Sequence, residues 1–251
     1  MKHVVAITDL RINRGSAFSL YIPLLTARPG SIVCVTGPNG SGKTTLIESI
    51  VGLVTGGKDN GAVRVNGQSV NNNLRTTKAM IGFIPDEENW FIKELSAQEY
   101  FELLISIYAK IGISVDRMKK RIVTLAAALY FTAFDQRLET LSHGNKKKVQ
   151  IIAGLMHSPR LVIMDELRNG LDPLAIIAAE KIIRDEAARN TCIIAATHDL
   201  WWAERIANDV ILLVNGRPVL NQAIADIIKE YGSLEKAFIA TVSISETHHA
   251  L

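Results

Sequence analysis

Short apolar runs alternate with longer amphipathic segments along most of this chain. Four runs rich in β-branched residues end at glycine or polar residues, over residues 31–37, 160–166, 191–199 and 209–216. Strands without polar positions are typical of a parallel sheet that is buried on both faces. The pattern therefore predicts an α/β fold with a mixed, largely parallel sheet covered by helices.

Two regions depart from this alternation. Residues 62–70 alternate around Asn66-Gly67, which predicts a hairpin in an N-terminal antiparallel β portion. Residues 96–133 carry helical periodicity without a strand pattern, which predicts an inserted α-helical subdomain. Beyond Asn221 we expect one or two terminal helices, followed by a frayed tail from residue 244.

Composition narrows the class of protein only slightly. The 251 residues are 48% hydrophobic and 21% charged, and a net charge of +3 mildly favours an acidic ligand or a membrane surface without requiring nucleic acid. The two cysteines lie in predicted strands, and we expect no disulfide. The longest apolar run, residues 122–134, is shorter than the about 20 residues of a membrane-spanning helix, and no signal-peptide pattern is present. We expect a cytoplasmic chain that does not cross a membrane by itself.

The segment GPNGSGKTT, residues 37–45, fits the phosphate-loop pattern G-x-x-x-x-G-K-[ST] between a predicted strand and a predicted helix. Its glycines allow backbone N–H groups to surround phosphate oxygens, and Lys43 would reach the β- and γ-phosphates. The Thr44 hydroxyl would ligate Mg²⁺. The alternative is a glycine-rich turn with an incidental lysine. The predicted phosphate-binding residues are Gly37, Pro38, Asn39, Gly40, Ser41, Gly42, Lys43, Thr44 and Thr45.

Two further strands end in side chains that suit nucleotide hydrolysis. Asp165, at the tip of the strand in LVIMDE, can hold the hydration shell of Mg²⁺, and Glu166 can act as a general base on water. His198 follows another strand and could contact a γ-phosphate. Taken singly, each has a plain alternative as surface charge or a turn residue.

The segment LSHGNKKKV, residues 141–149, permits two interpretations: a basic loop for nucleic acid or part of a phosphate site. The order of phosphate loop, LSHGN, LVIMDE, NGLDP and TH resembles the nucleotide-binding subunit of ABC transporters. The forms SHGN-K-K and GSLEKAF are most similar to ATPase subunits of type-2 ABC exporters. The resemblance covers nearly the whole chain.

This resemblance implies a single ABC ATPase domain with a P-loop NTPase (RecA-like) core at about residues 1–90 and 155–220. The helical subdomain would cover about residues 91–154, and a helical extension residues 221–251. Two cassettes would pair head to tail around two ATP, as a homodimer or a pseudo-symmetric heterodimer. They would use Mg²⁺ and power export through a separate polytopic membrane permease subunit, at the cytoplasmic face of the cell membrane.

The resemblance also implies which residues of this chain complete a partner's site. Ser142 and Gly144 would contact the γ-phosphate bound to the other chain, and His143 could add a donor or serve in packing. Asp172, in GLDP, would bridge the dimer interface. The run from Lys146 to Lys148 would form the solvated face of the following helix.

Five positions depart from the commonest family pattern, His143 and Asn145 among them. LSHGN replaces LSGGQ, and Leu167 replaces a proline. Asp86 stands where a glutamine is expected; it can ligate Mg²⁺ or accept from the attacking water, and we expect ATP turnover to survive. Glu87 or Glu88 could serve instead if the loop register slips. Arg14 stands near the position where the family usually has an aromatic residue that stacks on adenine. The planar guanidinium of Arg14 can also stack on a base, and Phe18 lies close by in the sequence.

Trp90 and Phe91 allow either contact with the membrane subunit or packing of the helical insertion onto the core. Three functions compete: an exporter ATPase, a soluble ABC ATPase acting on nucleic acid or ribosomes, and a regulatory nucleotide-binding module. The chain lacks the second cassette or long insertion typical of the soluble class, so nucleic acid is an unlikely partner. The retained Lys43, Asp165 and Glu166 favour hydrolysis. The sequence does not identify the transported substrate, because the translocation path belongs to another chain.

Overall fold

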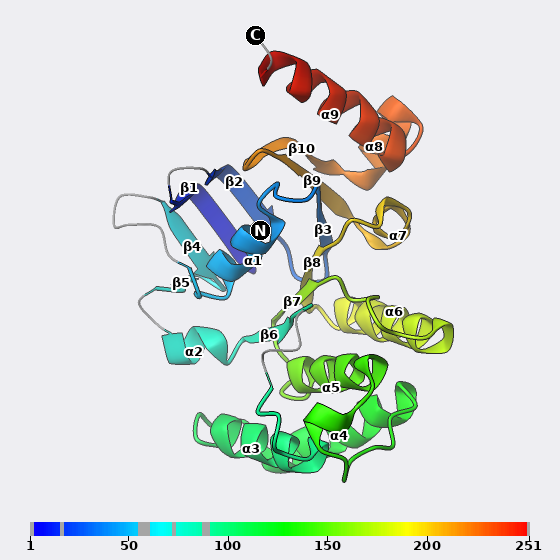
Figure 1. Ribbon diagram of the computed structural model, residues 1–251. Helices are drawn as coiled ribbons and strands as arrows, with labels where there is room; N and C mark the ends of the chain where they lie inside the picture. Colours follow the sequence, from blue (N-terminus) through cyan, green and yellow to red (C-terminus); the bar gives the residue numbers. More distant parts are fainter. Residues whose placement is uncertain (1–2, 16–17, 55–60, 72–73, 87–90, 250–251) are drawn as a thin grey trace.

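Two β-sheets form the framework of the molecule (Figure 1), whose computed structural model describes residues 3–15, 18–54, 61–71, 74–86 and 91–249. The antiparallel sheet has the order β2-β1-β4-β5, with strands Val5–Arg14 (β1), Phe18–Ala27 (β2), Ala62–Val65 (β4) and Gln68–Ser69 (β5). The larger sheet has the order β10-β9-β3-β8-β7-β6, with strands Ile32–Thr36 (β3), Ile81–Ile84 (β6), Leu161–Asp165 (β7), Cys192–Ala196 (β8), Asp209–Val214 (β9) and Arg217–Ala223 (β10). The predicted combination of a largely parallel sheet and an antiparallel portion is confirmed.

The larger sheet is parallel except for the β9–β10 pair, and both of its faces are buried. In β3, Ile32 and Cys34 face one hydrophobic cluster, whereas Val33 and Val35 face the other. Successive side chains of a strand point to opposite faces, so a sheet buried on both sides needs apolar residues at every position. This explains the continuous apolar runs of the sequence.

Helix α1 (Lys43–Ile50) lies between the two sheets. Its buried Leu46, Ile47 and Ile50 belong to the same hydrophobic cluster as residues of both sheets. The opposite face of the larger sheet is covered by a second hydrophobic cluster, to which the remaining long helices contribute side chains. The phosphate loop that precedes α1 is therefore held between two packed layers.

Two tight hairpins use Asn-Gly turns with both residues at positive φ. The predicted turn joins β4 to β5, with φ of 51° at Asn66 and 81° at Gly67. A second turn joins β9 to β10, with 48° at Asn215 and 75° at Gly216. We did not predict β10, although an Asn-Gly pair after an apolar run indicates a hairpin.

One short helix, α2, directly precedes β6, and the helices after β6 group on one side of the sheet. The helical segments are Leu74–Lys78 (α2), Ala97–Ala109 (α3), Val115–Ala128 (α4), Leu138–Thr140 (η2), His143–Leu155 (α5), Pro173–Ala188 (α6), Leu200–Ile206 (α7), Ile224–Tyr231 (α8) and Leu234–His249 (α9). Helices α3, α4 and α5 lie together beyond β6, at the end of the molecule away from α9 (Figure 1). Ser96 and Glu99 form a reciprocal capping box at the start of α3, so the predicted helical insertion begins as expected.

The boundaries of the predicted subdomains stay predictions, because α5 contacts both the helices and the sheet. A Cβ on Gly82 of β6 would lie 2.0 Å from the carbonyl oxygen of Gly154, so α5 crosses β6 closely. The terminal helices start at Ile224 rather than just after Asn221, because β10 continues to Ala223. The expected frayed tail was wrong for its first part, since α9 extends to His249. Within the described residues, we found no helix long and apolar enough to span a membrane.

Candidate functional site

The phosphate loop is a tight turn between β3 and α1. Gly37 has φ of 151°, and a Cβ there would lie 2.1 Å from the carbonyl oxygen of Leu213. The Lys43 ammonium donates to the carbonyl oxygens of Gly37, at 2.8 Å, and Pro38, at 3.1 Å. Lys43 therefore folds back over the loop, at the position where it could exchange these carbonyls for phosphate oxygens.

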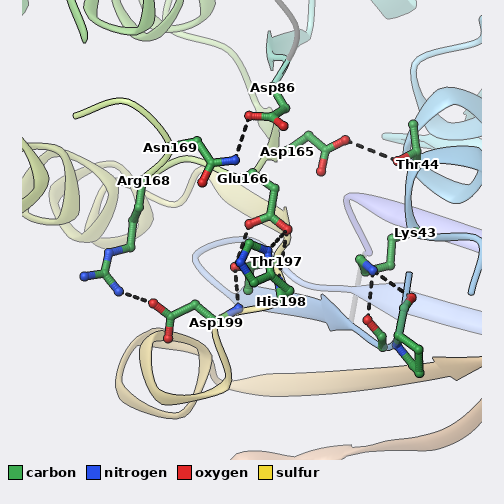
Figure 2. A network of polar contacts seen from close by, with 12 residues as sticks. Lys43, Thr44, Asp86, Asp165, Glu166, Arg168, Asn169, Thr197, His198 and Asp199 are labelled. Carbon is green, nitrogen blue, oxygen red and sulfur yellow. Dashed lines mark hydrogen bonds and ion pairs between the residues drawn. The ribbon is translucent and has the colours of Figure 1, made fainter. Parts of the chain in front are cut away.

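Three carboxylates gather at the carboxyl ends of β6 and β7, opposite this loop (Figure 2). The Thr44 hydroxyl donates to Asp165 Oδ2 at 3.4 Å, which connects the start of α1 to the end of β7. Asp86, after β6, accepts from Asn169 Nδ2 at 3.0 Å. The topology of a parallel sheet thus brings Asp86, Asp165 and Glu166, all three of them predicted site residues, to one edge.

Glu166 is held in a defined orientation by the loop after β8. Its Oε1 lies 2.7 Å from His198 Nδ1 and accepts from the His198 backbone N–H at 3.0 Å, and its Oε2 accepts from the Thr197 hydroxyl at 3.1 Å (Figure 2). The backbone of Glu166 has φ of 44°, which is unusual for a residue with a long side chain. Strained residues of this kind cluster at functional sites, and the bonds to Thr197 and His198 explain how the strain persists.

Charge is concentrated in this region. Burial, together with the neighbouring carboxylates of Glu166 and Asp86, raises the pKa of Asp165 to about 6, against the opposing charge of Lys147 and the hydrogen bond from Thr44. Burial lowers the pKa of Lys43, although Glu166 and Asp165 oppose the change. A buried carboxylate with two acidic neighbours is a suitable position for a cation.

A cavity of about 620 Å³ joins the phosphate loop to these carboxylates. It is lined by Arg14, Phe18, Asn39, Gly40, Gly42, Lys43, Thr44, Thr45, Asp86, Asp165, Glu166, Asn169 and His198. Arg14 and Phe18 belong to the antiparallel sheet, and Arg14 is paired with Glu48 of α1. The cavity therefore contains six of the nine predicted phosphate-loop residues, the predicted metal and base residues, and both candidates for stacking on a base.

Seven predicted residues are not among those that line the cavity: Gly37, Pro38 and Ser41 of the phosphate loop, and Ser142, His143, Gly144 and Asp172. Ser142 caps α5 by accepting from the backbone of Asn145 at 3.3 Å, and Asp172 caps α6 by accepting from Ala175 at 2.9 Å. Both caps are exposed at the surface. These residues thus have a local structural role, and within one chain they do not complete the site.

The start of α5 packs directly against the turn that follows Glu166. A Cβ on Gly170 would lie 1.8 Å from His143 Cδ2, and a Cβ on Gly144 would lie 2.7 Å from the Gly170 carbonyl oxygen. The His143 ring is therefore in close contact with Gly170, which supports its packing role. Gly144 is required by this close approach, in addition to any contact with phosphate.

The predicted solvated face of the three lysines was wrong. Lys147 is 2% exposed and Lys148 8% exposed, and only Lys146 is partly accessible. Lys147 donates to the carbonyl oxygens of Pro85 and Asp165, and Lys148 lies 3.7 Å from Asp172 Oδ2. The helical spacing of Lys147 with the buried Ile151 and Leu155 contained the signal, which the run of like charges obscured.

Two other site residues were missed, Asn169 and Thr197. Thr197 directly precedes His198, and Asn169 lies three residues after Glu166. Polar side chains after the carboxyl end of a parallel strand are the signal that could have found both. Phe91 is buried and packs edge-on against Tyr100 at 5.4 Å between ring centroids, which favours the packing alternative for this residue. Glu87, Glu88 and Trp90 lie outside the described residues.

Comparison with known proteins identifies the family. A solved structure of the ATP-binding subunit of an ABC transporter matches with a TM-score of 0.87 and 27% identity, over 95% of this chain and 99% of that one. The family model for the ABC transporter matches residues 23–169, more than half of the chain. The chain belongs to the ABC transporter family. The resemblance found in the sequence is therefore confirmed.

Curated relatives of this ABC transporter subunit agree with the assignment. The ABC-type transporter ATP-binding protein EcsA of Bacillus subtilis is 30% identical over 216 residues, which cover 84% of each chain. The Nod factor export ATP-binding protein I of Rhizobium sp. is 30% identical over 207 residues, which cover 82% of this chain and 66% of that protein. The chain is thus a nucleotide-binding ABC ATPase of the P-loop NTPase fold, a class of ATP-hydrolysing transporter subunits.

Proposed function

We propose that this subunit dimerises head to tail around two ATP and powers export through a separate membrane permease, at the cytoplasmic face of the membrane. One observation carries the dimer: the cavity contains the phosphate loop and the carboxylates but not Ser142 or Gly144. Those two residues stand at the exposed start of a helix, where backbone N–H groups suit an anion. A second cassette, identical or closely related, would supply them to each ATP.

Each chain's own residues then have distinct roles. Lys43 and the loop N–H groups bind the β- and γ-phosphates, and Arg14 or Phe18 stacks on the base. Glu166 accepts the proton of the attacking water, in an orientation held by Thr197 and His198. Because His198 Nδ1–H donates to Glu166, its Nε2 can donate to a γ-phosphate oxygen when both ring nitrogens carry a proton. Asp86 also orients the attacking water.

The donor set beside Thr44 fits Mg²⁺. Among the residues that the structure describes, no group of three or more His, Cys, Asp and Glu is arranged for a metal. Mg²⁺ usually binds one or two carboxylates together with substrate phosphates and water, which matches Asp165, Asp86 and the Thr44 hydroxyl. When bound, the ion would neutralise charge that develops on the phosphates.

A groove beside α3 is a suitable surface for a short helix of the permease. Two adjoining hollows, of about 240 and 470 Å³, share Lys78, Leu104 and Tyr108. Their rims expose Leu53 at 46% and Ile107 at 49%, so the groove presents apolar side chains to a partner. The similarity to the Nod factor export ATP-binding protein I of Rhizobium sp. supports the direction of transport.

Nucleic acid is a weaker alternative, because two of the three consecutive lysines are buried. A regulatory role without hydrolysis is weaker too, because Lys43, Asp165, Glu166 and His198 all line one cavity.

The dimer is tested by trapping it. With saturating Mg-ATP, Glu166→Gln should be dimeric in light scattering and slow in phosphate release, because ATP binds but water is not activated. Lys43→Ala should lose nucleotide binding and remain monomeric. Glu235→Gln, at an exposed position of α9, is the matched control and should hydrolyse ATP like the wild type. A Glu166→Gln protein that binds Mg-ATP but stays monomeric would rule out the composite site. Co-purification with a polytopic membrane protein tests the partner.

A further inference from the structure

Lys147 is a buried lysine in the helix that begins with the signature residues. Its side chain is 1% exposed, although lysine is among the residues least often buried. Replacing a buried ion pair by apolar side chains of similar volume is often neutral or stabilising, so packing alone does not explain an ammonium at this position. The contacts of the ammonium therefore have to explain it.

The ammonium contacts two segments of the nucleotide site. It donates to the carbonyl oxygen of Pro85 at 2.9 Å and to that of Asp165 at 3.2 Å. Its third neighbour is Asp86 Oδ1 at 3.9 Å. One side chain thus joins α5 to the residue before Asp86 and to the end of the strand that carries Asp165 and Glu166.

The charge of Asp86 gives this contact a second consequence. An additional carboxylate beside Asp165 and Glu166 is unfavourable next to bound phosphates, and a buried cation 3.9 Å away compensates for it. Lys148 forms a separate ion pair, in which its Nζ lies 3.7 Å from Oδ2 of Asp172 at the start of α6. Helix α5 is consequently connected to both loops that flank the carboxylates.

We propose that Lys147 is a positioning residue that balances the charge of Asp86 and fixes the start of α5, with Ser142, relative to the carboxylates of its own chain. This inference rests on the proposed function for its kinetic readout. Displacement of Asp86 and Glu166 by the loss of the ammonium affects the hydrolysis step, whereas the phosphate loop that binds ATP is not contacted by Lys147.

The test begins with Lys147→Met, which keeps the apolar stem and removes the charge. We expect kcat at saturating Mg-ATP to fall about tenfold or more, while KM and the Kd for ATP change less than about threefold. Lys147→Gln keeps one N–H donor for the Pro85 carbonyl and should be intermediate; it also serves if the Met variant does not fold. Lys119→Met, at an exposed position of α4, should match the wild type.

A double-mutant cycle with Asp86→Asn isolates the charge balance. In the Asp86→Asn background, Lys147→Met should lower kcat by less than about threefold, because the carboxylate that it compensates is gone. A purely structural lysine would have the same effect in both backgrounds. Equal effects, or an unchanged kcat for Lys147→Met, would overturn the proposal.

Hydrogen exchange separates this proposal from the proposed function. In the nucleotide-free protein, Lys147→Met should raise exchange in peptides that contain Pro85 and Asp86, and Asp86→Asn should reduce that increase. If the wild type does not hydrolyse ATP, the proposed function fails while these exchange data still decide the role of Lys147. Unchanged exchange would refute the contact whether or not the protein turns over ATP.

Discussion

His157 illustrates how much one buried side chain can determine. It follows α5, stacks on Tyr108 with ring centroids 4.2 Å apart, and its Nε2 lies 3.1 Å from the Ile81 carbonyl oxygen, to which the Nε2–H tautomer donates. Burial lowers the pKa of His157 to about 4; the bond to Ile81 opposes the shift, and the charge of Arg121 adds to it. The ring is thus neutral in the folded protein at pH 7.

This shift predicts a pH dependence of stability. In the unfolded chain, His157 has a pKa near 6.5 and binds a proton below that pH, whereas folded His157 stays neutral down to about pH 4. The contribution of this histidine to the free energy of unfolding is therefore fully present above about pH 6.5 and is lost as the pH drops towards 4. The total loss should be about 3 kcal/mol. Urea unfolding from pH 7 to pH 4 measures it. His157→Gln should remove this part of the slope, whereas His3→Gln, at an exposed position, should retain it. Parallel slopes for wild type and His157→Gln would contradict the assignment.

At the scale of elements, the junction between α5 and the turn before α6 depends on two glycines. Gly170 has φ of 78° and meets the His143 ring, and Gly144 meets the Gly170 carbonyl. The histidine that departs from the family signature therefore occupies space that a side chain at position 170 would need.

Gly170→Ala should lower the free energy of unfolding by about 2 kcal/mol, because it combines an unfavourable backbone conformation with a steric clash. In the Gly170→Ala variant, adding His143→Ala should recover the part of this loss that comes from the clash, and the part that comes from the backbone conformation should remain. Thermal and urea unfolding of both variants and of the double variant measure the coupling. Gly112→Ala is a control, since Gly112 also has positive φ, of 88°, but nothing lies within 4 Å of its added Cβ. Strict additivity of the Gly170 and His143 substitutions would show that the ring is not the obstacle.

At the scale of the whole molecule, each chain would contribute one half to each of two different ATP sites. One half is the cavity with Lys43 and Glu166, and the other is the exposed start of α5 at Ser142. In the proposed dimer, a substitution that disables the cavity and a substitution at Ser142 can be placed on different chains.

A mixture of Lys43→Ala and Ser142→Phe chains should therefore regain activity that neither has alone. Each mixed dimer has one intact site of two. We expect about one quarter of the wild-type rate if the chains pair at random and the sites act independently, and up to about one half if, as expected for Lys43→Ala, the single variants do not pair with themselves. Phosphate release against mixing ratio measures it. Mixing Lys43→Ala with Lys43→Ala,Ser142→Phe chains is the control and should stay inactive. Absence of recovery in the first mixture, with both chains folded, would argue against a shared site.

Much of this architecture was readable from local sequence. Apolar runs identified the buried strands because a sheet covered on both faces leaves no position for polar residues. The phosphate loop was recognisable because Lys43 and its glycines are contiguous, and backbone geometry alone imposes their spacing. β10 was missed because an exposed edge strand lacks such a run.

The sequence by itself determined the family, the phosphate loop and the order of the carboxylate strands, because these depend on short contiguous segments. Only the tertiary structure decided what the three lysines do. A run of like charges predicts solvation, but α5 is packed against the carboxyl ends of β6 and β7, where backbone carbonyls and Asp86 surround Lys147. That partner set comes from residues far apart in the chain, and no local pattern specifies the long-range packing that brings them together.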